Sequence, residues 1–324
     1  MPEQFFPLEV YTALLLATGI PFFVISLFDF YAILRHTPTS LKVYKPHFLN
    51  LLFWYFISLF LVVVVGRLDI NLMDGTICLT FYGFIELTGS VIAAYVESFV
   101  LGQGVFNVIM AVFVSFFFRY CQACHPHSLY SQEPYWQRVI NGSITVVVTT
   151  GLLTSLMVAV LVDACDPPRP FPSGITICFK TTIRLYVFLA LFALFLFLAS
   201  GFCFLFTVRT LYIISKKTSQ ASQRTKEMQK MLTITLSVSA AIPFVFGSIP
   251  LSLGIYVTVV QSPLANSVYR LAILMCVMQG LLQSIATLVL AKPYRQLLGR
   301  MIKTRSVVKA AETKTVVVTL SKVL

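Results

Sequence analysis

Long apolar blocks dominate this sequence and constrain its fold more than any other feature. Seven stretches of roughly 20 residues or more carry few charges, and about 20 apolar residues in a helix are enough to cross the hydrocarbon core of a bilayer. Hydrophobic residues make up 58% of the chain and charged residues 11%. A soluble protein of this length could not hide so much apolar surface, because it needs a polar exterior. The sequence therefore predicts a polytopic α-helical membrane protein.

Seven of these blocks are predicted to be transmembrane helices, at residues 10–34, 48–66, 91–118, 139–162, 185–208, 231–259 and 271–291. The segment 78–90 is also apolar enough for a short helix or a re-entrant piece. If it spanned the bilayer, the count would be eight and every later loop would change side. We expect residues 1–305 to form one all-α seven-helix domain. Residues 306–324 are polar and poor in aromatics, which predicts a disordered tail.

The distribution of basic residues predicts the orientation of the bundle. The segments 35–47, 119–138, 209–230 and 292–324 hold 3, 2, 6 and 8 of the 24 Lys and Arg residues, 19 in all. Cytoplasmic loops carry such an excess, so the N-terminus is expected outside and the C-terminus in the cytoplasm. The net charge of +12 does not indicate nucleic-acid binding, because the basic residues do not gather on one soluble face.

A short amphipathic helix is expected in the cytoplasm after the last crossing. Between residues 294 and 305, apolar and basic side chains take opposite faces at helical spacing. The apolar face holds Leu297, Leu298, Met301 and Ile302, and the basic residues around it are Arg295, Arg300, Lys303 and Arg305. A basic amphipathic helix of this kind lies on the anionic inner leaflet.

Three cysteines fall in segments that are predicted to lie outside. They are Cys78, Cys165 and Cys178, and only these three of the seven would meet an oxidising compartment. A bond between Cys78 and either of the others would restrain the outer mouth of the bundle. Three cysteines allow three pairings, and the sequence does not choose among them.

Two ionisable residues of the third predicted helix are candidates for function. Glu97 is costly against lipid, so it should face the bundle interior or water, either as a ligand contact or as a carboxyl near the outer interface. Arg119 follows 22 residues later, about 40° away around the helix and roughly 33 Å lower along it. With Tyr120 it ends the helix at the cytoplasmic side. There it is either a switch toward a docking protein or an ordinary positive anchor.

The segment between predicted helices 5 and 6 adds basic residues on the same side. Lys216 and Lys217 belong to it, and part of their charge serves only to orient the helices or to contact anionic lipid. The segment also lies beside Arg119 in the predicted bundle. Together these residues would form the rim of a cavity that opens if helix 6 pivots near Pro243.

The last predicted helix carries a polar stripe of Gln279, Gln283 and Ser284, with Gly280 beside them. Polar side chains on one face form hydrogen bonds across helices, and small residues permit close approach. The stripe is therefore interpreted first as packing, with a second role in rearrangement. Kinks are expected at the prolines that interrupt apolar helices, which are Pro21, Pro243 and Pro250.

The string Cys121-Gln-Ala-Cys124-His125 matches a covalent haem attachment sequence and offers ligands for zinc. Both interpretations are disfavoured, because the segment is predicted to be cytoplasmic at a membrane exit, and palmitoylation of these cysteines fits that place better. No nucleophile–base or metal constellation lies within the predicted helices. We therefore expect no cofactor, no bound metal and no enzymatic activity.

Several short motifs resemble those of nematode serpentine chemoreceptors, and the class H family within the larger Str group is the nearest. The motifs are ILRHTPTSLK at 33–42, KP at 45–46, LLFW at 51–54, QKM at 229–231, IP at 242–243 and 249–250, and KPYR at 292–295. They extend from the first predicted helix to residue 295, in an order that fits the helix map.

The resemblance implies a G-protein-coupled chemosensory receptor in the plasma membrane of sensory-neuron cilia. Its partners would be a small odorant or pheromone-like molecule and a heterotrimeric G protein. Phe118 precedes Arg119 where rhodopsin-like receptors carry an acid, and Asn-Pro-x-x-Tyr is absent from helix 7, so switch roles from those receptors do not transfer.

The alternative function is a seven-helix ligand-gated channel or transporter. Insect odorant channels place the N-terminus inside, however, whereas the charge distribution here places it outside. A retinal photoreceptor is disfavoured as well, because the block 271–291 contains no lysine for a Schiff base.

Overall fold

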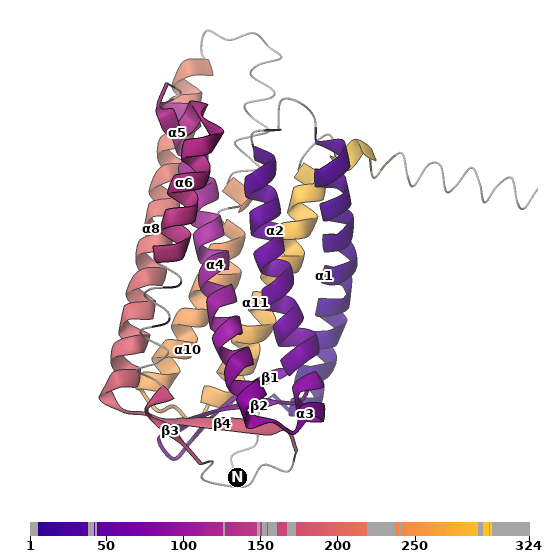
Figure 1. Ribbon diagram of the computed structural model, residues 1–324, viewed down its shortest axis with the longest axis vertical. Coiled ribbons are helices and arrows are strands. Elements are labelled where there is room, and N and C mark those ends of the chain that lie inside the picture. Colours follow the sequence, from indigo (N-terminus) through magenta and orange to yellow (C-terminus); the bar gives the residue numbers. More distant parts are fainter. Residues whose placement is uncertain are drawn as a thin grey trace, which may run out of the picture.

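The computed structural model describes residues 6–37, 42, 44–125, 127–147, 150, 154, 161–166, 173–218, 237–239, 241–290, 294–297 and 299. Long helices run side by side along one axis, and a small β-sheet lies across one end of them (Figure 1). We call this end the sheet end and the opposite one the far end. Helices fill the apolar length because a helix hydrogen-bonds all of its own interior backbone groups.

Six helices among the described residues are long and apolar enough to cross a membrane. Their elements are α1 (Leu8–His36), α2 (Lys45–Phe60) with the π-helical continuation η2 (Leu61–Gly66), α4 (Val91–Cys124), α8 (Ile183–Thr218), the π-helical η4 (Phe244–Ser248) with α10 (Ile249–Val259), and α11 (Ala265–Leu290). Each overlaps one predicted crossing. The remaining predicted crossing, 139–162, is covered at its start by α6 (Pro134–Thr145), and most of its remainder lies outside the described residues.

Small residues let the helices approach one another closely. α1 packs against α2 and α11, while α4 packs against α2 and α8. A Cβ atom added at Gly19 of α1 would lie 2.6 Å from Val63, and one at Gly280 of α11 would lie 2.5 Å from Leu59. Such contacts are typical of membrane helices, where close packing replaces the hydrophobic driving force. The packing role predicted for Gly280 is therefore visible in the structure.

The fold is mostly helical, as predicted, but it also contains a small β-sheet that the prediction of an all-α fold did not include. The sheet has four antiparallel strands in the order β1 (Leu68–Met73), β2 (Thr76–Phe81), β4 (Ile175–Lys180) and β3 (Ala164–Cys165). Asp74 and Gly75 join β1 to β2 with φ values of 46° and 72°. Such left-handed values suit a tight two-residue hairpin, and Asp-Gly is among the pairs that favour it.

The segment 78–90, for which a short helix or a re-entrant piece was considered, contains the end of a strand and a short helix. Its first part continues β2, and only Phe84–Thr88 forms a short helix, α3. The strand lies at the end of the bundle, and its backbone bonds to both neighbouring strands. An apolar stretch of this length can therefore be satisfied by sheet pairing instead of entering the bilayer.

A buried ion pair fastens the sheet to the helices. Arg270 of α11 makes two parallel hydrogen bonds to the Asp69 carboxylate in β1, both of 2.8 Å, with side-chain exposures of 3% and 1%. Asn71 donates a third hydrogen bond to Asp69, and Arg270 also donates to the backbone oxygen of Phe6. Tyr11 of α1 donates to the backbone oxygen of Leu68. One short strand is thus bonded to the beginning of α1 and to α11.

At the far end, Tyr294 contradicts a purely surface position for the segment after the last crossing. It is fully buried against Ala32, Ile33 and Leu288, and its hydroxyl lies 3.0 Å from that of Thr37. Residues 294–297 are helical, whereas the rest of the predicted amphipathic helix and the tail 306–324 lie outside the described residues.

Removing the cation of the buried pair should be costly, and removing both charges should not. We expect Arg270→Gln to lower the stability of the purified protein by about 3–5 kcal/mol, because Asp69 would remain buried without its counter-ion. The double variant Asp69→Leu/Arg270→Met should recover most of this loss, as measured by thermal unfolding in detergent. A double variant that is as unstable as the single one would show that the charges themselves are required.

Candidate functional site

Arg119 lies near the far end of α4, in a cavity between helices. Its guanidinium carbon is 6.0 Å from the ring centre of Tyr44 and 5.7 Å from that of Phe48, distances at which a cation is attracted to an aromatic face. Among the described residues, no carboxylate forms an ion pair with it. Burial raises the pKa of Tyr44 and the nearby charge of Arg119 lowers it. Arg119 is thus held by aromatic contacts in place of an ionic lock.

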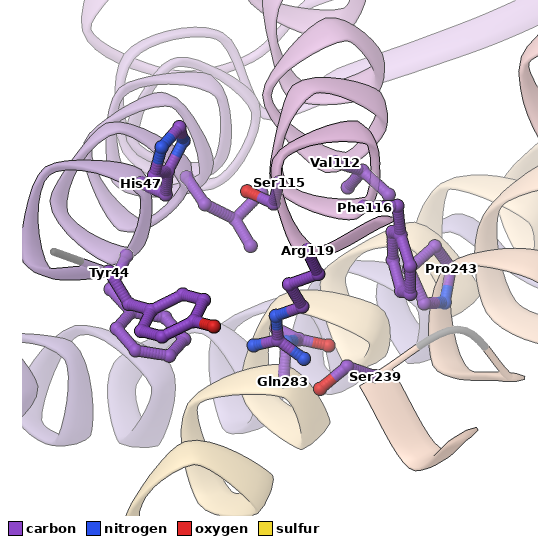
Figure 2. Close-up of a pocket in the computed structure, with 11 residues that line it drawn as sticks. Tyr44, His47, Val112, Ser115, Phe116, Arg119, Ser239, Pro243 and Gln283 are labelled. Carbon is purple, nitrogen blue, oxygen red and sulfur yellow. The ribbon is translucent and has the colours of Figure 1, made fainter. Parts of the chain in front are cut away.

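The cavity around Arg119 is built by four segments of the bundle (Figure 2). Its volume of about 20 Å³ is enough for roughly one water molecule. The sixth-helix segment, Ser237–Val259, contributes to the wall of this cavity. Movement of that segment would therefore change the volume of the cavity. The lining residues are Tyr44, His47, Phe48, Leu51, Val112, Ser115, Phe116, Arg119, Ser239, Pro243 and Gln283.

The neighbours of Arg119 in the sequence point elsewhere. Phe118 is fully buried, and its ring stacks on His47 of α2 with the ring centres 4.3 Å apart. Tyr120 stacks on Phe206 of α8 with the centres 5.0 Å apart. Phe118 thus packs against His47 at the position where rhodopsin-like receptors carry an acid before the arginine. Of the two residues predicted to act together, Arg119 lies in the cavity and Tyr120 lies at the interface of α4 with α8.

The two lysines that were predicted to share in coupling are only partly placed. Lys216 is exposed near the end of α8. The side chain of Lys217 and the segment 219–236 lie outside the described residues. The basic rim predicted around Arg119 therefore remains a prediction.

A second small cavity adjoins the first and contains an acid that the sequence analysis missed. Asp29 of α1 is 1% exposed, and neither carboxylate oxygen has a hydrogen-bond partner in the described part of the chain. The two cavities share Phe48, Leu51 and Gln283. A buried carboxylate and a guanidinium therefore face neighbouring cavities on either side of Gln283. The signal in the sequence was a single acid within the apolar block 10–34, which is expensive in a membrane and usually functional.

The polar stripe of α11 divides into packing and cavity residues. Gln279 donates a hydrogen bond to the Tyr55 hydroxyl of α2, and the hydroxyl of Ser284 lies 3.4 Å from that of Ser26 in α1. Both contacts join α11 to neighbouring helices. Gln283 differs, because its side-chain oxygen is buried without a partner among the described residues. It is the residue of the stripe best placed to change partners.

Glu97 lies toward the sheet end of α4, near residues that close the bundle. It is 5% exposed, and one carboxylate oxygen has no partner within the described residues. A Cβ atom added at Gly66 would be 2.5 Å from the other oxygen and 3.0 Å from the ring of Phe81. Arg67 follows with a left-handed φ of 43°, a conformation that is uncommon for residues other than glycine. The carboxylate is thus enclosed, polar and incompletely bonded.

An apolar cluster covers this part of the bundle. It joins the sheet to α3, α4 and α8, so Glu97 lies beneath a hydrophobic roof. Its buried members are Leu68, Phe81, Ile85, Ala94, Ile177, Phe179 and Leu185.

The structure selects one pairing among the cysteines at the sheet end. Cys78 of β2 and Cys178 of β4 form a disulfide, whereas Cys165 of β3 is a free thiol. The bond ties the hairpin after η2 to the strand before α8. In the described residues, no group of three or more His, Cys, Asp or Glu side chains could hold a metal ion.

Asp29 and Asp69 allow one chemical change to be tested in two environments. We expect Asp29→Asn to raise the free energy of unfolding by about 1–3 kcal/mol, because it removes a buried charge that lacks a partner. Asp69→Asn should lower it, because that charge is paired with Arg270. Thermal unfolding of both variants in the same detergent measures the difference. If Asp29→Asn is as destabilising as Asp69→Asn, then Asp29 has a compensating partner.

Comparison with known proteins assigns the chain to one family. The family model described as serpentine type 7TM GPCR chemoreceptor Srh matches residues 8–304. The comparison with curated proteins finds no significant match. The family match covers nearly the whole chain and confirms the resemblance seen in the sequence motifs. The chain therefore belongs to the Srh family of serpentine seven-transmembrane chemoreceptors and is a multi-pass membrane protein.

Proposed function

We propose that this receptor binds a small, largely apolar ligand near the sheet end and signals to a heterotrimeric G protein from the far end. The observation that carries the proposal is Arg119, a cation in an interhelical cavity with aromatic neighbours and no carboxylate partner among the described residues. A cation held in this way is free to exchange its aromatic contacts for contacts with a docking protein.

The proposed orientation places the sheet end outside the cell. Two independent features support it. Nineteen of the 24 basic residues fall in the segments that are predicted to be cytoplasmic, as the positive-inside rule requires. The disulfide between Cys78 and Cys178 lies at the sheet end, and disulfides persist in oxidising compartments outside the cytosol. The far end, with Arg119, would then face the G protein.

The coupling step would be a change in the wall of the Arg119 cavity. A cation–π contact contributes about 0.5–2 kcal/mol, which is small enough for a helix displacement to break it. Ser239 and Pro243 belong to the sixth-helix segment of the wall, and the π-helical η4 begins directly after Pro243. Such wide turns often mark functional positions. We infer that the segment pivots here and exposes Arg119.

The ligand would bind beneath the sheet, where Glu97 is the enclosed polar group. Its apolar surroundings favour a hydrophobic ligand body, and its unpartnered oxygen favours a ligand that donates a hydrogen bond or carries a positive charge. The disulfide and the Asp69–Arg270 pair hold the roof over this position. A rigid roof would restrict the size and shape of accepted ligands.

Arg119→Ala should uncouple the receptor without removing it from the membrane. With a promiscuous G protein and a broad odorant panel, we expect calcium responses to fall at least about tenfold, the scale of a lost charge-assisted hydrogen bond. Replacing Lys216 and Lys217 together should have a milder effect. The matched control is Arg35→Ala, which removes an exposed arginine at the end of α1 and should leave the responses unchanged.

The same cells test orientation and the alternative function. An N-terminal epitope should be accessible on intact cells, and a C-terminal one only after permeabilisation. A ligand-evoked current that persists with G proteins inhibited, and that Arg119→Ala leaves unchanged, would identify a channel. The reverse epitope pattern would contradict the proposed orientation.

Glu97→Gln should affect ligand sensitivity and spare coupling. For any panel odorant that activates the wild-type receptor, we expect the concentration for half-maximal response to rise about tenfold or more. This follows from the loss of a hydrogen bond to a charged group, about 1.5–3 kcal/mol. The maximal response should be kept. Glu86→Gln is the control, because the Glu86 side chain is exposed and accepts a hydrogen bond from the Gly174 backbone. Equal shifts in both variants would place the ligand elsewhere.

A further inference from the structure

Three cysteines lie in one row across neighbouring strands at the sheet end. In the register of the sheet, Cys78 of β2 is directly opposite Cys178 of β4, and Cys165 of β3 is opposite the same Cys178. Directly opposed residues of antiparallel strands point to the same face of the sheet, with Cβ atoms about 4.5–5.5 Å apart. Cys178 on the central strand therefore has one cysteine on each side.

Only one of these two neighbours is bonded to Cys178. The disulfide joins Cys78 and Cys178, and Cys165 is a free thiol with a partly exposed side chain. Thiol–disulfide exchange occurs when a thiolate attacks one sulfur of a disulfide and displaces the other. The attacking sulfur approaches in line with the bond that breaks. Cys165 lies on the side of Cys178 that is remote from Cys78, which is the side required for that approach.

We propose that the sheet holds a thiol–disulfide switch in which Cys165 and Cys78 alternate as partners of Cys178. The Cys165 thiolate attacks the Cys178 Sγ atom, a Cys165–Cys178 bond forms, and the Cys78–Cys178 bond breaks. Cys78 leaves as a thiolate and takes up the proton that Cys165 released. One disulfide and one thiol are present before and after the step, so it needs no external oxidant or reductant.

The exchange would change which parts of the receptor are covalently joined. The Cys78–Cys178 bond links residues 100 positions apart and ties the β1–β2 hairpin to the strand that leads into α8. The Cys165–Cys178 bond would close a loop within the connection 165–178 and leave β2 held to β4 by hydrogen bonds alone. Phe81 of β2 and Phe179 of β4 both belong to the roof cluster. The consequence for ligand access, unlike the exchange itself, rests on the proposed function.

The surroundings of Cys165 determine how fast the exchange proceeds. Burial raises the pKa of the Cys165 thiol, and Asp166 raises it further, whereas Lys180 of β4 lowers it. Tyr95 of α4 is a further titratable neighbour. The thiol is therefore mainly protonated at neutral pH. Because the thiolate is the attacking species, exchange is expected to be slow at neutral pH and faster under mildly alkaline conditions.

Disulfide mapping of the purified full-length receptor tests the switch without any ligand or G protein. The protein is incubated in detergent without oxidant or reductant, at neutral and at mildly alkaline pH. Free thiols are then alkylated under acid quench, and the peptides are analysed by mass spectrometry. We expect the Cys165–Cys178 peptide to appear as the Cys78–Cys178 peptide declines, faster at the higher pH, with the total amount of disulfide constant.

Two variants isolate the two partners. Cys165→Ser should retain the Cys78–Cys178 bond under all conditions. Cys78→Ser leaves two thiols, so it should form the Cys165–Cys178 bond when an oxidant such as oxidised glutathione is supplied. Wild-type protein in which Cys178 stays bonded only to Cys78, with Cys165 always alkylated, would overturn the proposal. This wild-type time course decides the matter even if Cys78→Ser fails to fold. Cys203 and Cys276, which are outside the row, report whether alkylation requires unfolding.

Discussion

The need to bond every backbone group inside an apolar medium determines most of this architecture. Helices meet that need alone, whereas strands require partners. The chain accordingly uses helices along the apolar length and confines its strands to one end. The short strand β1 depends on its partners: Arg270 and Asn266 of α11 bond to it, as does Tyr11 of α1. The sheet is therefore an integral part of the bundle, and the hydrogen bonds of these side chains hold it in position.

Buried charges divide into two classes, those that are compensated and those that are not. Asp69 and Arg270 compensate each other with two short hydrogen bonds, and together they hold the roof in place. Asp29 and Glu97 retain unpartnered oxygens within the described residues, and Arg119 contacts two aromatic rings and has no carboxylate partner there. Uncompensated burial costs free energy. Groups kept in that condition are therefore the ones to which a ligand, a partner or a rearrangement can add binding energy.

The helices could be predicted from the sequence because a membrane-spanning helix must only be long and apolar. It is not necessary to know which of its faces packs against the bundle. The sheet was missed although the Asp74-Gly75 turn signal was present, because its strands are as apolar as a helix and gain their partners from distant segments. The Asp69–Arg270 pair joins residues 201 positions apart, a contact that no local pattern encodes. Glu97 was singled out because a carboxylate is costly in a membrane, and Arg119 because it lies at the cytoplasmic end of the third predicted helix. Asp29 carried the same signal and was passed over.

Glu97 and Arg119 belong to one unbroken helix, and this bears on how a ligand signal would travel. α4 runs from Val91 to Cys124, so a displacement at the sheet end moves its far end as well. α11 also reaches both regions, with Arg270 at the roof and Gln283 between the two far-end cavities. A shift of α4 against α2 would alter the contact of Arg119 with Phe48, and a shift of α11 would move Gln283 in the wall of the same cavity. Two rigid helices that can pack in alternative arrangements would be enough to transmit the ligand signal. A continuous chain of interacting side chains would not be required.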